Sequence, residues 1–309
     1  MMSEWISWLE DLTQVDGETV GRKCANLGEL TRAGFQVPPG FALSLGAYEG
    51  FLGATGAGRE IREFFAPFDA DPNDPKQLAK FTEASSVARE IVESKGMPRD
   101  MGGPLAGSYD ELCARTGIRE VPVATRSAGS SSHPGQYESF LNVSGRAGVM
   151  ENVVKVWSST FNTRSLVARA RKGLPLESDP IGVAVLQMVD ADAAGVMFTA
   201  EPTTADATRI IIEGSRGLGE IVVSGAVIPD NWTVDATEFT VVDRRAAPTG
   251  QRTCLYDEEV IEIAKLGKLI EAHFGKPQDI EWAIDRSLPS NPIFILQARP
   301  ETFRINFRF

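Results

Sequence analysis

The sequence contains few cysteines and histidines, and this scarcity argues against several classes of site. The three cysteines, Cys24, Cys113 and Cys254, lie far apart and have no metal-type spacing. They fit a reducing cytoplasm better than a disulfide framework. The two histidines, His133 and His273, have no partner at the spacing of a metal site or of a serine or cysteine triad. We therefore predict neither a zinc site nor triad chemistry.

The chain also lacks an excess of positive charge and any long apolar run. Its net charge of −11 argues against a nucleic-acid or anionic-membrane surface. The N-terminus is acidic where a signal peptide needs basic residues, and no apolar run reaches membrane-spanning length. We expect a cytoplasmic protein with no nucleic-acid or membrane partner. A few placed Arg and Lys residues can still form a local site for an anionic substrate.

Two common nucleotide-binding patterns are missing as well. The glycine-rich run 214–220 lacks the third glycine of the dinucleotide-binding pattern. It also lacks the Gly-Lys-Ser or Gly-Lys-Thr of a P-loop. We therefore predict neither fold for this chain.

The 309 residues, 42% hydrophobic and 24% charged, are typical of a globular chain with a substantial core split between two lobes. The hydrophobic pattern predicts a mixed α and β architecture without internal repeats. We expect helical structure at 23–33, 48–117 with a break at 71–75, 149–172 as one long helix, and 257–274 with Asp257 as N-cap. We expect strands at 41–44, 121–125, 136–143, 181–189, 195–199 and 209–213.

The most informative segment is a predicted hairpin near the end of the chain. Alternate side chains of a strand share a face, so Asp279 and Glu281 point to the same side of the first strand. By the same period, Ile295, Gln297 and Arg299 share a face of the second strand. The residues between the two strands, 285–292, are rich in turn formers and are predicted to form the loop.

One antiparallel register places Glu281 opposite Gln297 and Asp279 opposite Arg299. Directly opposed side chains have Cβ atoms roughly 5 Å apart, so a carboxylate and an amide oxygen can share one hard cation. Mg²⁺ typically takes one or two protein oxygens together with phosphate oxygens. The spacing alone is equally compatible with a solvated face carrying a cross-strand salt bridge, so both interpretations stay open here.

Two cations occupy positions that suit an anionic ligand. Lys23 lies near a predicted helix start, where the helix macrodipole disfavours a positive charge. Arg126 ends a predicted strand and precedes a loop of small residues, whose backbone N–H groups can point at phosphate oxygens. An ordinary solvated lysine and a flexible turn are the alternatives. His133 lies in the same loop and is kept as a polar group near phosphates, whereas His273 is interpreted as a cation at a helix end.

Taken together, the motifs resemble the ATP-binding domain of the phosphoenolpyruvate synthase and pyruvate phosphate dikinase family. The resemblance spans residues 15–302, and its motifs occur in the family's order. They are Gly21–Lys23, Leu27–Glu29, Val37–Phe41, Ala124–Ser127, Gly135–Glu138, Gln187–Val189, Gly195–Thr199, Gly217–Glu220, Pro229–Asp230, Asp279–Trp282 and Gln297–Thr302.

The resemblance implies an α+β ATP-grasp fold whose two lobes clamp ATP. Residues 1–120 would form part of the N-terminal lobe with a helical insertion, and residues 121–309 the remainder with the metal-binding hairpin. The implied catalytic residues are Lys23, Arg126 and Arg299, and the implied Mg²⁺ ligands are Glu281 and Gln297. ATP binding would use these five together with Arg164, Gln187, Met188, Val189 and Asp279, the middle three reading adenine largely through backbone groups.

Two departures from the family pattern shape the functional hypothesis. The loop 128–134 is shorter than in the family and lacks its acidic pair. The chain also stops soon after Thr302, without the family's phosphorylatable histidine domain or pyruvate-binding barrel. We therefore expect a histidine-carrying partner subunit or domain that receives the β-phosphoryl group while ATP becomes AMP and phosphate, and a small-molecule acceptor bound elsewhere.

A divided enzyme such as phenylphosphate synthase, with phenol as acceptor, is the closest functional hypothesis. The alternatives are an excised domain of a phosphoenolpyruvate synthase or a rifampin-type phosphotransferase, an ATP-grasp ligase that releases ADP, and an ATP-sensing module without chemistry. The joint presence of Lys23, Arg126, Glu281, Gln297 and Arg299 argues against the sensor.

Overall fold

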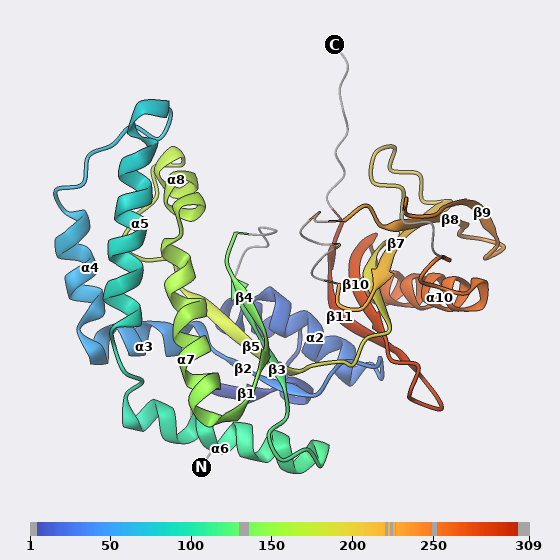
Figure 1. The fold of residues 1–309 in the computed structure, drawn as a ribbon, viewed down its shortest axis with the longest axis horizontal. Helices are drawn as coiled ribbons and strands as arrows, with labels where there is room; N and C mark the ends of the chain where they lie inside the picture. Colours follow the sequence, from blue (N-terminus) through green and yellow to red (C-terminus); the bar gives the residue numbers. More distant parts are fainter. Residues whose placement is uncertain are drawn as a thin grey trace. The chain divides into compact units, whose positions relative to one another are not determined.

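The computed structural model describes residues 5–129, 136–219, 222, 225, 227–248 and 252–301. The chain divides into two compact units. Unit 1 comprises Met1–Glu29 and Pro39–Met188, and unit 2 comprises Leu30–Pro38 and Val189–Phe309. The expected boundary between residues 120 and 121 falls inside unit 1. The expected mixture of helices and sheets is confirmed (Figure 1).

Unit 1 contains a five-stranded sheet in the order β1-β2-β5-β3-β4. All of its neighbouring strands pair antiparallel. The central strand β5 is buried along almost its whole length, which explains its continuous apolar sequence. The strands are β1 Ile6–Trp8, β2 Gly40–Leu43, β3 Val123–Gly129, β4 Ser139–Val143 and β5 Ile181–Gln187.

Most helices of the chain belong to unit 1 and share its hydrophobic core, which includes Phe41, Trp157 and Val183. The predicted helical region with a break at 71–75 is confirmed, since α4 ends at Phe65 and η3 begins at Pro75. The helices are η1 Leu9–Asp11, η2 Gln14–Asp16, α1 Gly17–Val20, α2 Arg22–Arg32, α3 Leu45–Thr55, α4 Ala57–Phe65, η3 Pro75–Gln77, α5 Leu78–Glu93, α6 Arg99–Thr116, α7 Gly145–Ser158, η4 Ser159–Phe161 and α8 Thr163–Arg171. Helix α2 begins in unit 1 and ends in unit 2.

The prediction of one long helix over 149–172 is wrong. The hydroxyls of Ser159 and Thr160 donate to the backbone carbonyls three residues earlier, at 2.7 and 2.8 Å, and the α-helix tightens there into η4. Asn162 then starts α8 as its N-cap, because its side chain accepts a hydrogen bond from the Ser165 N–H at 2.8 Å.

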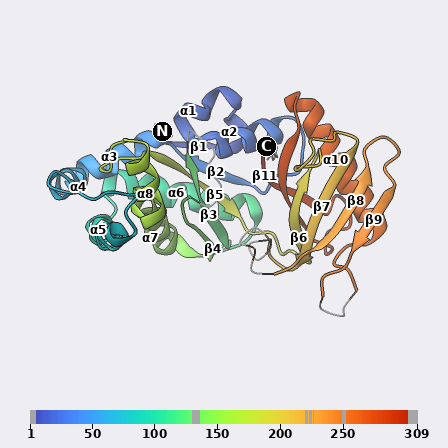
Figure 2. The ribbon, with the colours of Figure 1, turned by 90° about the horizontal axis from the view of Figure 1, so that it is seen from above.

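Unit 2 contains a six-stranded antiparallel sheet in the order β11-β10-β6-β7-β8-β9. Helix α10, Asp257–Phe274, packs along this sheet (Figure 2). Their shared core includes Trp232, Ile263 and Trp282. The strands are β6 Ala193–Phe198, β7 Arg209–Arg216, β8 Asp230–Asp235, β9 Val241–Arg245, β10 Gln278–Ile284 and β11 Ile293–Pro300. Strands β1, β8 and β9 were not predicted from the sequence.

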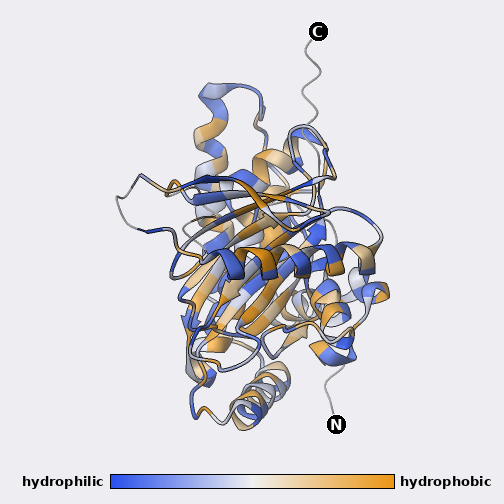
Figure 3. Cartoon of the chain, turned by 90° about the vertical axis from the view of Figure 1, so that its right-hand side faces the viewer, coloured by the Kyte–Doolittle hydropathy of each residue, from blue (hydrophilic) through white to orange (hydrophobic). Residues whose placement is uncertain are grey.

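Helix α10 has the predicted bounds, Asp257–Phe274, but its N-cap differs from the predicted one. Tyr256, not Asp257, is the N-cap, and the Tyr256 N–H donates to the Glu259 carboxylate at 2.8 Å. The acidic first turn that the sequence suggested is present, since Asp257, Glu258 and Glu259 all lie in it. Hydrophilic and hydrophobic residues alternate along this helix (Figure 3). None of the described helices has the length and apolar run that a membrane crossing needs.

Candidate functional site

The predicted hairpin is present, and its register is the expected one. Strands β10 and β11 pair antiparallel, with Glu281 opposite Gln297 and Asp279 opposite Arg299. The loop between them is closed by a hydrogen bond from the Asp285 N–H to the Pro292 carbonyl at 2.9 Å. Four polar side chains are thus aligned in two adjacent cross-strand pairs of unit 2.

The predicted face of Ile295 is wrong. The register shifts between Glu281 and Trp282, so that Trp282 pairs with Ile295 and Leu296 becomes an extra residue. Such a bulge interrupts the alternation of side chains. Ile295 therefore joins Ala298 and Trp282 in the buried core instead of the polar face. The bulge leaves the polar pairs on the other side of it unchanged.

Asp279 and Arg299 form a largely buried ion pair. Nε and Nη2 of Arg299 donate to the same Asp279 oxygen, at 2.8 and 2.5 Å. The side chains are 11% exposed for Asp279 and 24% for Arg299. Burial raises the pKa of the Asp279 carboxyl, with a further contribution from the Glu281 charge, although the Arg299 guanidinium opposes this shift. Asp279 therefore fixes the position of Arg299, and the Arg299 guanidinium in turn neutralises the charge of the buried Asp279 carboxylate.

Glu281 and Gln297 supply a donor set that fits Mg²⁺. Glu281 is half-buried and Gln297 is buried, and each contributes side-chain oxygen, the ligand that this hard cation prefers. The described residues form no group of three His, Cys, Asp or Glu side chains suited to a metal ion. The pair thus fits a metal that takes one or two protein oxygens and completes its shell with phosphate and water.

The same sheet face carries two further polar residues that the sequence reasoning missed. Glu281 pairs with Val196 on β6, Val196 with Glu213 on β7, and Glu213 with Asn231 on β8, so these residues form one row across the sheet. The Asn231 amide donates to Glu213 at 3.1 Å. Glu213 alternates with buried Ile210 and Ile212 along β7, which is the available sequence signal for its orientation.

In unit 1 the structure brings Lys23 and Arg126 close to the same buried thiol. Lys23 is the second residue of α2, as predicted, and Arg126 lies in the middle of β3. Both positive charges lower the pKa of Cys24, although burial dominates and raises it to about 12. The sequence did not show this proximity.

Gly21 explains how the start of α2 approaches β3. A Cβ at this position would lie 2.0 Å from the backbone oxygen of Ala128, two residues after Arg126. The φ angle of Gly21 is also +84°, a conformation that side chains disfavour. Glycine at position 21 therefore permits the close approach of the start of α2 to the end of β3, the strand that carries Arg126.

Four further residues were expected to bind ATP, namely Arg164 and residues 187–189. Arg164 is exposed in the first turn of α8. The N–H groups of Gln187 and Met188 donate to the carbonyls of Pro39 and Pro122, at 2.9 and 2.8 Å. The adenine contacts expected at residues 187–189 would therefore use groups other than these two amides. Val189 is the first residue of the second segment of unit 2.

The structure also shows where several other residues singled out in the sequence lie. His273 lies in the last turn of α10, as predicted, and its ring contacts those of Phe35 and Phe274. Asp230, from the Pro-Asp motif, has a structural role, since its carboxylate accepts hydrogen bonds from the N–H groups of Ala247 and Cys254, both at 2.7 Å. His133, Gly135, Glu220 and Thr302 lie outside the described residues, as does most of the loop 128–134.

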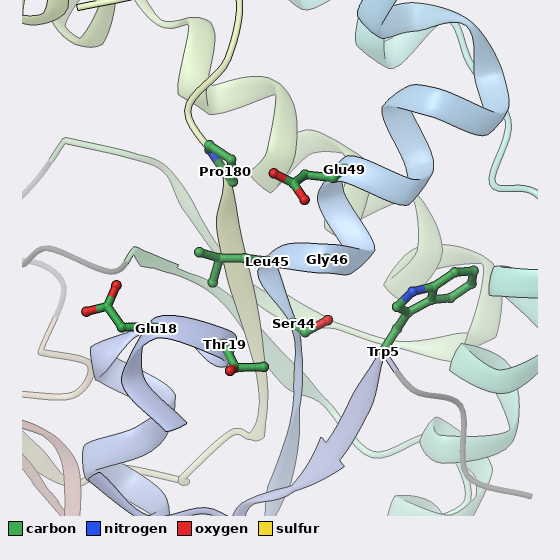
Figure 4. Close-up of a pocket in the computed structure, with 8 residues that line it drawn as sticks. All are labelled: Trp5, Glu18, Thr19, Ser44, Leu45, Gly46, Glu49 and Pro180. Atoms are coloured by element: carbon green, nitrogen blue, oxygen red, sulfur yellow. The ribbon is translucent and has the colours of Figure 1, made fainter. Parts of the chain in front are cut away.

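An open pocket of about 500 Å³ in unit 1 is separate from these residues. It is lined by side chains near the starts of α1 and α3 (Figure 4). None of the predicted site residues lines it, and we assign it no role. The lining residues are Trp5, Glu18, Thr19, Ser44, Leu45, Gly46, Glu49 and Pro180.

Glu301, just beyond β11, is a half-buried acid whose two carboxylate oxygens are shielded from water. Burial raises its pKa to about 7, and the charges of Asp279, Glu201 and Glu271 add to the shift. The Ala200 amide lies near enough to lower this pKa somewhat, but its geometry falls short of a hydrogen bond. Neither carboxylate oxygen of Glu301 has a hydrogen-bond partner among the described residues.

We expect Glu301→Gln to stabilise the protein in a pH-dependent way. A carboxyl with a raised folded-state pKa stabilises the fold below its unfolded pKa, about 4.3, and this contribution is lost as the pH rises toward 7. The melting temperature of the variant should therefore exceed that of the wild type more at pH 8 than at pH 5. Equal differences at both values would contradict the assignment.

Comparison with known proteins gives a consistent result. Residues 17–252 and 246–306 match the family described as pyruvate phosphate dikinase, AMP/ATP-binding domain. A probable phosphoenolpyruvate synthase of Methanothermobacter thermautotrophicus is 36% identical over 97% of this chain and 46% of its own length. The phosphoenolpyruvate synthase of Pyrococcus furiosus is 33% identical over 98% of this chain and 44% of its own length. The chain thus spans less than half the length of these curated relatives.

Among solved structures, an L-amino acid ligase from Bacillus licheniformis is similar over 79% of this chain and 54% of its own. The two chains are 15% identical, and the TM-score of 0.30 is too low to inform the fold.

Proposed function

Because the chain belongs to the family of the pyruvate phosphate dikinase AMP/ATP-binding domain, we propose that it is the ATP-binding part of a dikinase-type phosphotransferase. The proposed fold is ATP-grasp, in which two lobes clamp the nucleotide. The observation that carries the proposal is the register of the β10–β11 ladder, which aligns Glu281 with Gln297 and Asp279 with Arg299. This arrangement combines oxygen donors for Mg²⁺ with a fixed guanidinium for phosphate.

The proposed roles follow from the chemistry of each side chain. Lys23 and Arg126, which lie close to Cys24 in unit 1, bind phosphate oxygens of ATP. Arg299, oriented by Asp279, binds phosphate oxygens from unit 2. Arg164 adds a further positive charge, and residues 187–189 bind adenine. Catalysis in such a site consists mainly of positioning and charge neutralisation.

Glu281 and Gln297 would hold the Mg²⁺ through side-chain oxygen. When bound, this ion neutralises phosphate charge and orients the polyphosphate. Asp279 stays outside the proposed ligand set, because its oxygen accepts both hydrogen bonds from Arg299.

The proposed reaction transfers a phosphoryl group to a histidine on a partner subunit or domain. A nitrogen of that histidine attacks the β-phosphorus, the bond from the β-phosphorus to the α-phosphate oxygen breaks, and AMP leaves. Hydrolysis of the γ-phosphoryl group releases phosphate and leaves the β-phosphoryl group on the histidine. The acceptor histidine in this proposal lies outside the described residues.

The final acceptor is a small molecule bound outside this chain. Phenol, the acceptor of the phenylphosphate synthase hypothesis, belongs to this proposal. The described residues contain no feature that selects phenol over pyruvate. The names of the relatives favour the phosphoenolpyruvate synthase type of reaction.

The nucleotide product tests this proposal against the ligase and sensor alternatives. The chain would be incubated with Mg²⁺ and ATP, together with a histidine-domain protein encoded next to it or taken from a phosphoenolpyruvate synthase. We expect AMP and phosphate, measured by chromatography. Accumulation of ADP would support a ligase, and binding without any product would support a sensor.

A further inference from the structure

The residues just before β4 are fixed by an unusual set of polar contacts in unit 1. Arg89 on α5 donates to both oxygens of Glu138, with Nη1 and Nη2 at 2.5 and 2.9 Å. The Glu138 N–H donates to the Ser159 hydroxyl at 3.1 Å. One residue earlier, the Tyr137 hydroxyl donates to Asp179. The contacts of Glu138 thus connect one short segment to α5 and η4.

This segment leads directly into the strand that borders Arg126. Strand β4 starts at Ser139, and Ser139 pairs with Arg126 on β3. β4 is the edge strand of its sheet, and only Val143 of its five residues is buried. Near the start of β4, Tyr137 and Phe140 pack against the core but are only partly buried, so apolar packing fixes this end of the strand less firmly than a buried strand. The polar contacts of residues 137 and 138 add to the restraint that the β3–β4 ladder supplies.

The Arg89–Glu138 pair is suited to this task by its geometry. Two parallel hydrogen bonds fix both the distance and the orientation of the two side chains. The pair is also partly shielded from water, with side-chain exposures of 28% for Arg89 and 36% for Glu138. Arg89 contacts Glu93 at 3.4 Å as well, and Glu93 accepts a hydrogen bond from Ser158 at 2.5 Å. The arginine is thus itself held in place.

We propose that Arg89 and Glu138 are positioning residues for the phosphate-binding Arg126. By anchoring the start of β4, they keep Ser139 against Arg126 and so restrict where the Arg126 guanidinium can lie. This inference rests on the proposed function, in which Arg126 binds phosphate. Arg89 and Glu138 then act on the site only through Arg126, and neither residue contacts ATP.

The test compares a ligand with phosphates to one without. Glu138→Gln removes the charge and one of the two acceptors at nearly constant shape, and Arg89→Lys removes the paired donors but keeps the charge. Dissociation constants for MgATP and for adenosine would be measured by calorimetry on the full chain. We expect ATP affinity to fall about tenfold in either variant, the loss of roughly one charge-assisted contact. Adenosine affinity should be unchanged.

Glu60→Gln is the matched control. It breaks the Lys95–Glu60 pair, whose 2.7 Å distance and side-chain exposures of 22% and 41% resemble those of Arg89–Glu138. Glu60 lies on α4 and has no role in the site. ATP affinity should stay at the wild-type value in this variant, while thermal unfolding reports any general loss of stability in all three.

A double-mutant cycle with Arg126→Ala shows whether the pair acts through Arg126. Glu138→Gln should weaken ATP binding in the wild-type background and have no further effect in the Arg126→Ala background. Equal losses in both backgrounds, or an equal loss of adenosine affinity, would overturn the proposal. Failure of the wild type to bind ATP would instead contradict the proposed function itself.

Discussion

Replacing Glu281 by glutamine is expected to reduce AMP formation by about 100- to 1,000-fold, the size of effect that follows removal of one preorganised electrostatic group from an active site. Glutamine keeps the shape and one oxygen of the side chain but removes the charge that a bound Mg²⁺ needs. Glu281 is half-buried, and the pairing of β10 with β6 is continuous on both sides of it, so the fold should remain intact. AMP formation would be followed over a range of Mg²⁺ concentrations with the histidine-domain protein present.

Glu262→Gln is a suitable control for this experiment. It removes the same charge from an exposed position on α10 and should leave the rate unchanged. The circular dichroism and melting temperature of the Glu281 variant should match those of the wild type within a few degrees. Full activity of Glu281→Gln at low Mg²⁺ concentration would exclude this residue as a metal ligand.

Replacing Arg299 by methionine is expected to destabilise the protein by about 3 kcal/mol, because removing one partner of a buried ion pair leaves the other charge uncompensated. Asp279 is the buried partner, and its pKa is already raised by burial despite the presence of Arg299. Without Arg299, this pKa should rise further. The destabilisation should therefore be largest near neutral pH and should shrink as the pH falls and Asp279 becomes protonated. Urea unfolding at several pH values measures both effects.

The double variant Asp279→Asn/Arg299→Met separates stability from activity. It removes both charges, so most of the lost stability should return. AMP formation should be low in Arg299→Met and stay equally low in the double variant, because both lack the Arg299 guanidinium that binds phosphate from unit 2. Recovery of activity together with stability would show that the pair is a structural ion pair without a role in phosphate binding.

The sequence alone predicted the hairpin well, for a specific reason. The alternating polar residues and the loop rich in turn formers define a two-stranded element and its register. The bulge at Leu296 was not predictable in the same way. Ile295 and Leu296 are both apolar, so either can face the core, and only packing against Trp282 decides which residue does.

Other differences between prediction and structure arise where side chains form local hydrogen bonds that the hydrophobic pattern of the sequence does not reveal. The apolar period continues from α7 into α8, and it suggested one helix. Ser159 and Thr160 nevertheless bond back to the backbone, and Asn162 caps a new helix. Strand β8 shows the opposite case, because its buried Trp232 and Val234 alternate with polar residues in a stretch interpreted without a strand.

The approach of α2 to β3 could not be predicted from spacing, since Lys23 and Arg126 belong to elements far apart in the chain. The small residue Gly21, which allows α2 to approach β3, becomes informative only once Ala128 is seen beside it. The family resemblance named both residues without a geometric reason. The close approach of Gly21 to Ala128 now supplies one.

The most direct test of the account follows the β-phosphorus of ATP. β-labelled or γ-labelled ATP would be incubated with Mg²⁺, this chain and a histidine-domain protein, and the protein-bound label would be measured with its acid and alkali stability. We predict that β-label appears on the partner protein as acid-labile phosphohistidine, with one AMP formed for each phosphoryl group transferred. Transfer of γ-label alone, with ADP as the nucleotide product, would contradict the central claim.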